Sequence, residues 1–167
     1  GAGAAHGDIT LVDAIDTATI NENVSFNLNA HDDINIDNTI TDTGMGLNVN
    51  LVADYDNSGD QPGNGGGADV FIDDAITTNG GDFTATASDD VRVRAAVNTS
   101  GGDVTLSALG NTAGTAVVQI TSDGSIDTDD SDPDGDVTII AEDVNINTTS
   151  GKKISAGFDG INDGDIT

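Results

Sequence analysis

The stretch GDFTATASDDVRVRAAVNTSGGDVTLSA, residues 81–108, contains three short runs in which apolar residues alternate with small or polar ones. The apolar positions of the three runs are, in order, Phe83, Ala85 and Ala87, then Val91 and Val93, then Val97. Alternation with a period of two predicts β-strands, and the Asp, Asn, Ser and Gly residues between the runs predict turns. The opening phrase returns 21 residues after Gly81 as GDVTLSA from Gly102, which is typical of one coil of a parallel β-solenoid.

The same three phrases recur in the same order along the chain. Copies of the first phrase begin at Gly7, Asn23, Gly46, Gly81, Gly102, Gly135 and Gly164. The second phrase places two apolar residues around one variable residue, at Ile34 and Ile36, Val70 and Ile72, Val91 and Val93, Val118 and Ile120, and Val144 and Ile146. The third phrase is one apolar residue before a polar corner, at Ile40, Ile76, Val97, Ile126 and Ile154.

Stacking these coils places like residues over like, because alternate side chains of a strand point to opposite faces. The expected inward ladder of the first face is Val24, Leu47, Phe83, Val104 and Val137, and that of the second face is Ile34, Val70, Val91, Val118 and Val144. We therefore predict an all-β fold, a parallel β-solenoid of about six coils with three short strands per coil and acidic loop insertions.

The domain organisation follows from where the phrases begin. We expect residues 1–6 to be a flexible lead-in or a remnant of cloning, and residues 7–167 to form a single solenoid domain. The last copy of the first phrase, Gly164-Asp-Ile-Thr, is cut short, which suggests that the strand ladder continues in the same polypeptide or in a neighbouring copy. The domain is thus interpreted as a segment of a longer array or filament, with neighbouring copies or adjacent repeats stacked end to end.

The amino-acid composition excludes several classes of binding partner. The 167 residues carry 30 acids and four Lys or Arg, a formal net charge of −26. Such a surface repels nucleic acid and anionic membranes and attracts cations. The chain has no cysteine, which excludes thiol chemistry and disulfides, and its apolar runs are too short for a membrane-spanning helix. His6 and His31 are isolated and no Ser lies in a nucleophile elbow, so we expect no enzyme of the nucleophilic type.

Two acidic insertions predict calcium loops. DSDPDGD places Asp130, Asp132, Asp134 and Asp136 at alternating positions, and DYDNSGD does the same with Asp54, Asp56, Ser58 and Asp60. Alternating oxygen ligands with a Gly at the turn can wrap one hard cation, so Ca²⁺ is the expected cofactor. Neither loop completes a twelve-residue EF-hand, because the closing position falls on Ala141 or Gly65. Ligands from a neighbouring coil are therefore needed, and the alternative is a pair of solvated acidic turns.

The few basic residues bear on the enzymatic alternative, a calcium-dependent polysaccharide-binding or polysaccharide lyase β-helix. Its base would come from Arg92, Arg94, Lys152 or Lys153, the only Lys and Arg of the chain. The register predicts a structural use of the two arginines instead, with Arg94 paired to Asp73 one coil away and Arg92 over Phe71. Ice binding through the third face is excluded, because its outward positions read Thr41, Thr77, Asn98, Asp127 and Ser155 and form no regular threonine array.

Several phrases resemble a known family. GDVTLSA from Gly102, GDVTIIAEDVNI from Gly135 and AITTNGG from Ala75 are similar to the repeats of filamentous haemagglutinin-like, β-helical giant surface proteins of bacteria. The resemblance covers about residues 7–167 and implies a right-handed parallel β-helix exported to the cell surface as part of an adhesin or fibre. It further implies an extracellular structural or adhesive role, with glycans or a host or neighbouring cell surface as possible partners. No receptor-binding motif carries over.

Overall fold

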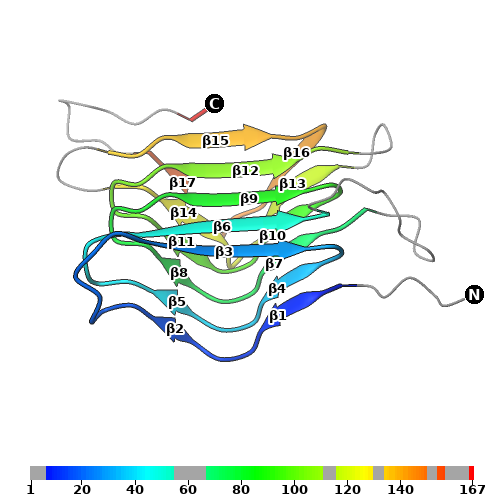
Figure 1. Cartoon of the computed structure of the whole chain (residues 1–167). Helices are drawn as coiled ribbons and strands as arrows, with labels where there is room; N and C mark the ends of the chain where they lie inside the picture. Colours follow the sequence, from blue (N-terminus) through cyan, green and yellow to red (C-terminus); the bar gives the residue numbers. More distant parts are fainter. Residues whose placement is uncertain (1–6, 55–66, 111–115, 130–133, 150–153, 157–165) are drawn as a thin grey trace, which may run out of the picture.

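The computed structural model describes residues 7–54, 67–110, 116–129, 134–149, 154–156 and 166–167. These residues form strands and turns, and no helix occurs among them. Each strand pairs in parallel with the corresponding strand of the next coil (Figure 1). The predicted parallel β-solenoid of about six coils, with three strands per coil, is confirmed. Within the described ranges, no helix is present that could cross a membrane.

Three sheets run along the solenoid. Sheet A contains β1 (Ile9–Leu11), β4 (Ile34–Ile36), β7 (Val70–Ile72), β10 (Val91–Val93), β13 (Val117–Ile120) and β16 (Asp143–Ile146). Sheet B contains β2 (Ile15–Asp16), β5 (Ile40–Thr41), β8 (Ile76–Thr77), β11 (Ala96–Asn98), β14 (Ser125–Asp127) and β17 (Ile154–Ser155). Sheet C contains the longer strands β3 (Val24–Ala30), β6 (Leu47–Ala53), β9 (Phe83–Ala87), β12 (Val104–Ala108) and β15 (Val137–Ile140).

The registers of sheets A and B agree with the prediction. Val91 pairs with Val70 and with Val118, and Val97 pairs with Ile76 and with Ile126. The ladders of the second and third phrases therefore run without a shift from coil to coil. The two arginine contacts are also confirmed, because Arg92 lies opposite Phe71 and Arg94 pairs with Asp73 at 2.9 Å.

Two details of the sheet C alignment are wrong. The phrase that begins at Gly7 belongs to sheet A, since Ile9 pairs with Ile34, and the first coil therefore starts with the second phrase. In addition, Phe83 pairs with Val49 rather than with Leu47, a shift of two residues. Such a shift leaves the same face inward because the side-chain period of a strand is also two. Sequence alternation alone therefore could not separate the two registers.

The interior of the solenoid is filled by stacked aliphatic side chains. The largest fully buried side chains include Phe83, Ile34, Leu51, Leu106 and Ile126. Stacking of near-identical side chains in successive coils gives a continuous apolar core from the second coil to the fifth. The last coil departs from this pattern, since Val144 and Ile146 of β16 are about half exposed, whereas Ile154 of β17 is partly buried against the core.

The B–C corner, where each sheet B strand leads into sheet C, is built from threonine and glycine. A buried threonine column runs through Thr17, Asp42, Thr78, Thr99 and Thr128, with an aspartate in the second coil. In coils three to five the hydroxyl donates a hydrogen bond to the carbonyl of a following glycine, from Thr78 to Gly81, Thr99 to Gly102, and Thr128 to Gly135. The backbones approach closely here, because a Cβ added to Gly102 would lie 2.2 Å from the Gly81 carbonyl oxygen.

Candidate cation-binding corners

The structure separates the two predicted calcium loops. Asp54 directly follows β6 at the corner between sheets C and A, where it is buried and has a φ of 57°. Asp134 and Asp136 precede β15 at the B–C corner, three coils further along the solenoid. The other predicted ligands, Asp56, Ser58, Asp60, Asp130 and Asp132, lie outside the described residues. The calcium loops therefore stay a prediction.

The C–A corner, between each sheet C strand and the next sheet A strand, carries an aspartate column made of Asp8, Asp33, Asp69 and Asp90. Oδ1 of each aspartate accepts a hydrogen bond from a backbone N–H of the next coil. The distances are 3.4 Å from Asp33 N to Asp8, 2.9 Å from Asp69 N to Asp33, 2.9 Å from Asp90 N to Asp69, and 2.9 Å from Val117 N to Asp90. The column thus connects five successive coils through charged acceptors, which form stronger hydrogen bonds than neutral ones.

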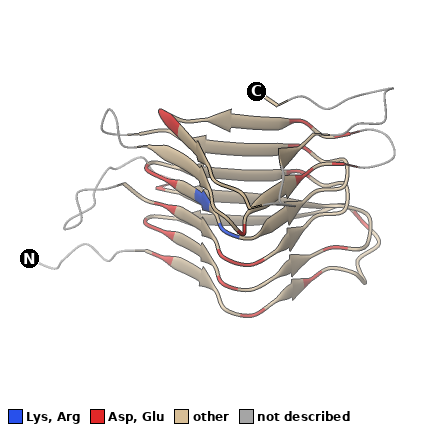
Figure 2. Ribbon diagram, turned by 180° about the vertical axis from the view of Figure 1, so that it is seen from behind, with Lys and Arg blue, Asp and Glu red and all other residues tan. Residues whose placement is uncertain are grey.

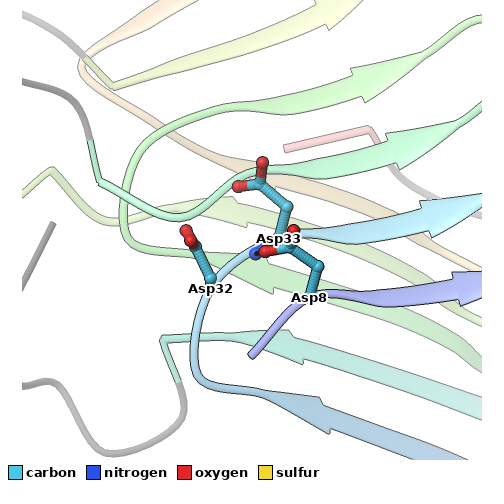
Figure 3. Close-up of side chains that lie close together, drawn as sticks. All are labelled: Asp8, Asp32 and Asp33. Atoms are coloured by element: carbon cyan, nitrogen blue, oxygen red, sulfur yellow. Dashed lines mark hydrogen bonds between the residues drawn. The ribbon is translucent and has the colours of Figure 1, made fainter. Parts of the chain in front are cut away.

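Two groups of carboxylates gather around this column. Ligand oxygens of Asp8, Asp32 and Asp33 all lie within 4.8 Å of one another, and the same holds for Asp69, Asp89 and Asp90. Figure 3 shows the first group at the start of β1 and β4, with the Asp8 side chain lying below Asp33 and Asp32 beside them. Three carboxylates at this spacing are the type of donor set that Ca²⁺ binds. The two groups lie one after the other along the C–A corner. Acidic residues recur at the corners of the solenoid (Figure 2).

Arg92 gives the second group a positive partner. Its guanidinium lies 3.6 Å from the carboxylate of Asp69 and donates a hydrogen bond to Asp90. The guanidinium carbon also stacks 5.1 Å from the centre of the Phe71 ring, which Arg94 approaches to 4.8 Å. A guanidinium in contact with both carboxylates already supplies part of the charge that a metal ion would bring. Among the two groups, Asp8, Asp32 and Asp33 are therefore the better candidate for a cation.

Burial affects the acidity of this corner. The pKa of Asp69 is raised from 3.8 to about 6, mainly by burial and in part by the neighbouring charges of Asp90 and Asp33. The Asp90 N–H and Arg92 act in the opposite direction and do not overcome the effect of burial. The pKa of Asp33 is raised as well, mainly by burial and in part by Asp32 and Asp8. Crowding of partly desolvated carboxylates is the common physical cause.

A second ladder of the same kind borders sheet C on its other side. It consists of Asn48, Asp82, Asp103 and Asp136, and each Oδ1 accepts the backbone N–H of the next member. Two of these hydrogen bonds measure 3.0 Å and the third 2.9 Å. Its first member is an asparagine, so a neutral side chain can make the same hydrogen bond. Asp136, a predicted calcium ligand, takes part in this ladder through its backbone N–H.

Asp42 shows the opposite electrostatic behaviour inside the threonine column. Burial alone would raise the pKa of this carboxyl, but hydrogen bonds from Thr17 and from the backbone of Gly44, Gly46 and Thr43 lower it below 3.8. The Thr17 hydroxyl lies 2.7 Å away and the two glycine N–H groups lie 3.1 Å and 3.0 Å away. A carboxylate held by several donors stays charged even when it is buried.

Sequence reasoning missed the two carboxylate groups of the C–A corner. The signal was present, because an aspartate precedes the second phrase at Asp33, Asp69 and Asp90 and a second acid precedes it in two of these coils. Stacking the coils by this phrase would have placed these acids in one column. Asp8 could not be found in this way while the Gly7 phrase was assigned to the first face.

Comparisons with protein-family models, with curated proteins and with solved structures find no match for this chain.

Proposed function

We propose that the chain is a structural segment of an extracellular fibre or stalk, a solenoid whose function is its own length and stiffness. The observation that carries the proposal is the continuity of its columns. Three parallel sheets, an aliphatic core and the corner ladders continue from coil to coil. A structural use of the corner carboxylates supports the proposal, since Asp33, Asp69 and Asp90 each accept a backbone N–H of the next coil.

The surface location is the second element of the proposal. It is supported by the resemblance of the repeat phrases to filamentous haemagglutinin-like surface proteins and by a net charge of −26, which keeps the chain soluble. An adhesive role, with glycans or another cell surface as partner, belongs to the same proposal.

Stacking is the third element. Apolar columns of sheet A end in the half-exposed side chains of Val144 and Ile146, and the strands β1 and β16 are the outermost strands of the sheet. Ile9 and Leu11 occupy the corresponding inward positions of the first coil. A further coil of the same kind, from the same polypeptide or from another copy, would cover these side chains and pair with the edge strand.

Small-angle X-ray scattering tests the structural role. A single copy of about six coils has an axial length of roughly 30 Å at the spacing of parallel strands. The cross-section should stay constant while the length either remains at this value or grows with protein concentration through stacking. A length that stays at this value at every concentration would argue against stacking between copies, and a scattering profile that does not fit this solenoid would argue against the structural role. Release of unsaturated sugars from an acidic polysaccharide would instead favour the lyase alternative.

Calcium is the fourth element, and a thermal melt followed by far-ultraviolet circular dichroism tests it. The melting temperature should be higher in millimolar calcium than in EDTA, while magnesium and sodium should have little effect. The Asp32→Asn variant tests the candidate group of the first coils, and the double variant Asp130→Asn with Asp132→Asn tests the acidic insertion. A melting temperature that does not change with calcium would remove the ion from the proposal and leave the solenoid as an acidic spacer.

A further inference from the structure

Among the residues that the structure describes, one Asn–Gly dipeptide occurs, Asn79–Gly80, in the B–C turn that connects β8 to β9. Both residues have a left-handed backbone, with a φ of 52° at Asn79 and 92° at Gly80. Asparagine and glycine adopt this conformation more readily than other residues. The next coil makes the same kind of turn at Ser100–Gly101, with φ values of 50° and 98°. The turn itself therefore does not require the amide of Asn79.

An Asn–Gly dipeptide can modify itself. The backbone nitrogen of the glycine attacks Cγ of the asparagine, a new C–N bond forms, the Cγ–Nδ2 bond breaks, and the amide nitrogen leaves as ammonia. Water then opens the succinimide ring and gives aspartate or isoaspartate. Glycine favours the attack because it has no side chain to obstruct it. Water is the only co-reactant, so the reaction depends on whether the backbone can reach the required geometry.

The fold holds both reacting nitrogens in hydrogen bonds to other coils. Nδ2 of Asn79, the leaving group, donates to the Gly44 carbonyl of coil two at 2.8 Å. The backbone N–H of Gly80, the nucleophile, donates to the Thr99 carbonyl of coil four. The attack requires Gly80 N to lose its proton and to approach Cγ of Asn79, and the hydrogen bond to Thr99 opposes both steps. The closed corner therefore keeps the two groups from reacting.

We propose that Asn79–Gly80 is a site of covalent self-modification that the fold keeps inactive, so that Asn79 deamidates only when the B–C corner between coils two and four opens. The modified corner cannot close in its original form, because a carboxylate has no N–H to donate to the Gly44 carbonyl. Isoaspartate also adds a methylene to the main chain, at a corner where a Cβ on Gly81 would already lie 2.3 Å from the Leu47 carbonyl oxygen. Opening of this corner thus leaves a permanent chemical mark. The site goes beyond the structural role proposed above and does not depend on it.

The rate of deamidation should follow the fraction of molecules in which the corner is open. A substitution that weakens this corner should therefore accelerate the reaction. Thr99→Val is such a substitution, since it removes the hydroxyl that donates to the Gly102 carbonyl next to the Gly80 contact. Thr105→Val makes the same chemical change in the same coil, on the outer face of β12, and serves as the matched control.

The first experiment follows the wild type during warm incubation in weakly alkaline buffer, with and without urea, by mass spectrometry of its peptides. In urea, Asn79 should deamidate about as fast as Asn64, which precedes the other Asn–Gly bond of the sequence. In the folded chain the reaction of Asn79 should be slower by about tenfold or more. Equal rates at Asn79 in the two conditions, or no reaction in urea, would overturn the proposal. This comparison requires no variant to fold.

The second experiment compares variants in the same buffer without urea. Thr99→Val should raise the rate at Asn79 by about 5- to 30-fold, whereas Thr105→Val should leave it unchanged. Asn79→Ser, which copies the turn of the next coil, should show no mass increase in this peptide. Its urea midpoint should stay constant during incubation, while deamidated wild-type protein should unfold at lower urea. Equal rates in the two threonine variants, or an unchanged urea midpoint after deamidation, would contradict the proposal.

Discussion

At the B–C corner the chain turns through buried threonines and closely packed glycines, whereas at the C–A corner it turns through partly buried aspartates. Both corners connect strands of the same solenoid, and both satisfy backbone groups with side-chain hydrogen bonds. In coils three to five the threonine hydroxyls donate to glycine carbonyls of their own coil. Two hydroxyls of the column also reach the next coil, from Thr17 to Asp42 and from Thr128 to the Ser155 carbonyl. The aspartates instead accept N–H groups from the next coil.

The difference shows how one repeat can combine a fixed element with an adjustable one. In coils three to five the B–C corner depends on the absence of side chains at Gly81, Gly102 and Gly135, so we expect steric contact to determine it there, whereas the second coil has the charged Asp42 at this corner. The C–A corner brings several carboxylates close together, so we expect its stability to depend on pH and on salt. The following substitutions test this difference between the two corners.

The largest effect is expected for Gly102→Ala. The new Cβ would lie 2.2 Å from the Gly81 carbonyl oxygen, and the contact can be relieved only if the backbones of two coils separate. We expect a loss of about 3–5 kcal/mol in the free energy of unfolding or a failure to fold. Urea unfolding at neutral pH measures it. Gly80→Ala is the control, since its nearest contact is 3.8 Å and only the positive φ of 92° should cost about 1 kcal/mol. Equal losses in the two variants would show that close approach is not the cause.

Asp42→Asn tests the single position where the threonine column contains a charge. The amide cannot accept all the hydrogen bonds of the carboxylate, and its NH₂ group would face a backbone donor, so we expect a loss of about 2 kcal/mol at neutral pH. Because the pKa of Asp42 is lower in the folded chain, its contribution is complete above 3.8 and is lost as the pH falls below that value.

The difference between Asp42→Asn and the wild type should therefore shrink in strong acid. This direction is opposite to that expected for Asp69, whose contribution is lost as the pH rises. Unfolding curves of Asp42→Asn and Asp69→Asn over the same pH series compare the two corners directly. A constant difference for Asp42→Asn at every pH would mean that the carboxylate charge is not what stabilises this turn.

The smallest effect is expected for Thr99→Val, which removes the hydroxyl that donates to the Gly102 carbonyl and keeps the shape of the side chain. One buried acceptor loses a partner, so we expect a loss of about 1–2 kcal/mol that does not vary with pH. The control is Thr105→Val on the outer face of sheet C, where a change within about 0.5 kcal/mol is expected. A pH-dependent loss at Thr99 would remove the distinction between a steric and an electrostatic corner.

The sequence was sufficient for the architecture and for two of the three sheets. Alternating runs that return in the same order predicted parallel strands, and the two apolar residues of each second phrase placed Val70, Val91 and Val118 in one ladder. The contact of Arg94 with Asp73 followed from the same register. These features depend on which face a residue occupies, and the period of two determines the face locally.

The tertiary structure was needed to show which residues of neighbouring coils pair in sheet C and which acidic side chains come together. Leu47 and Val49 are both apolar and both point inward, so the sequence could not tell that Val49 lies opposite Phe83 while Leu47 lies opposite Gly81. The grouping of Asp8 with Asp33 likewise depends on a hydrogen bond between residues 25 positions apart. Alternation specifies the face of a side chain, whereas backbone pairing between coils specifies its neighbour, and that pairing exists only in the folded chain.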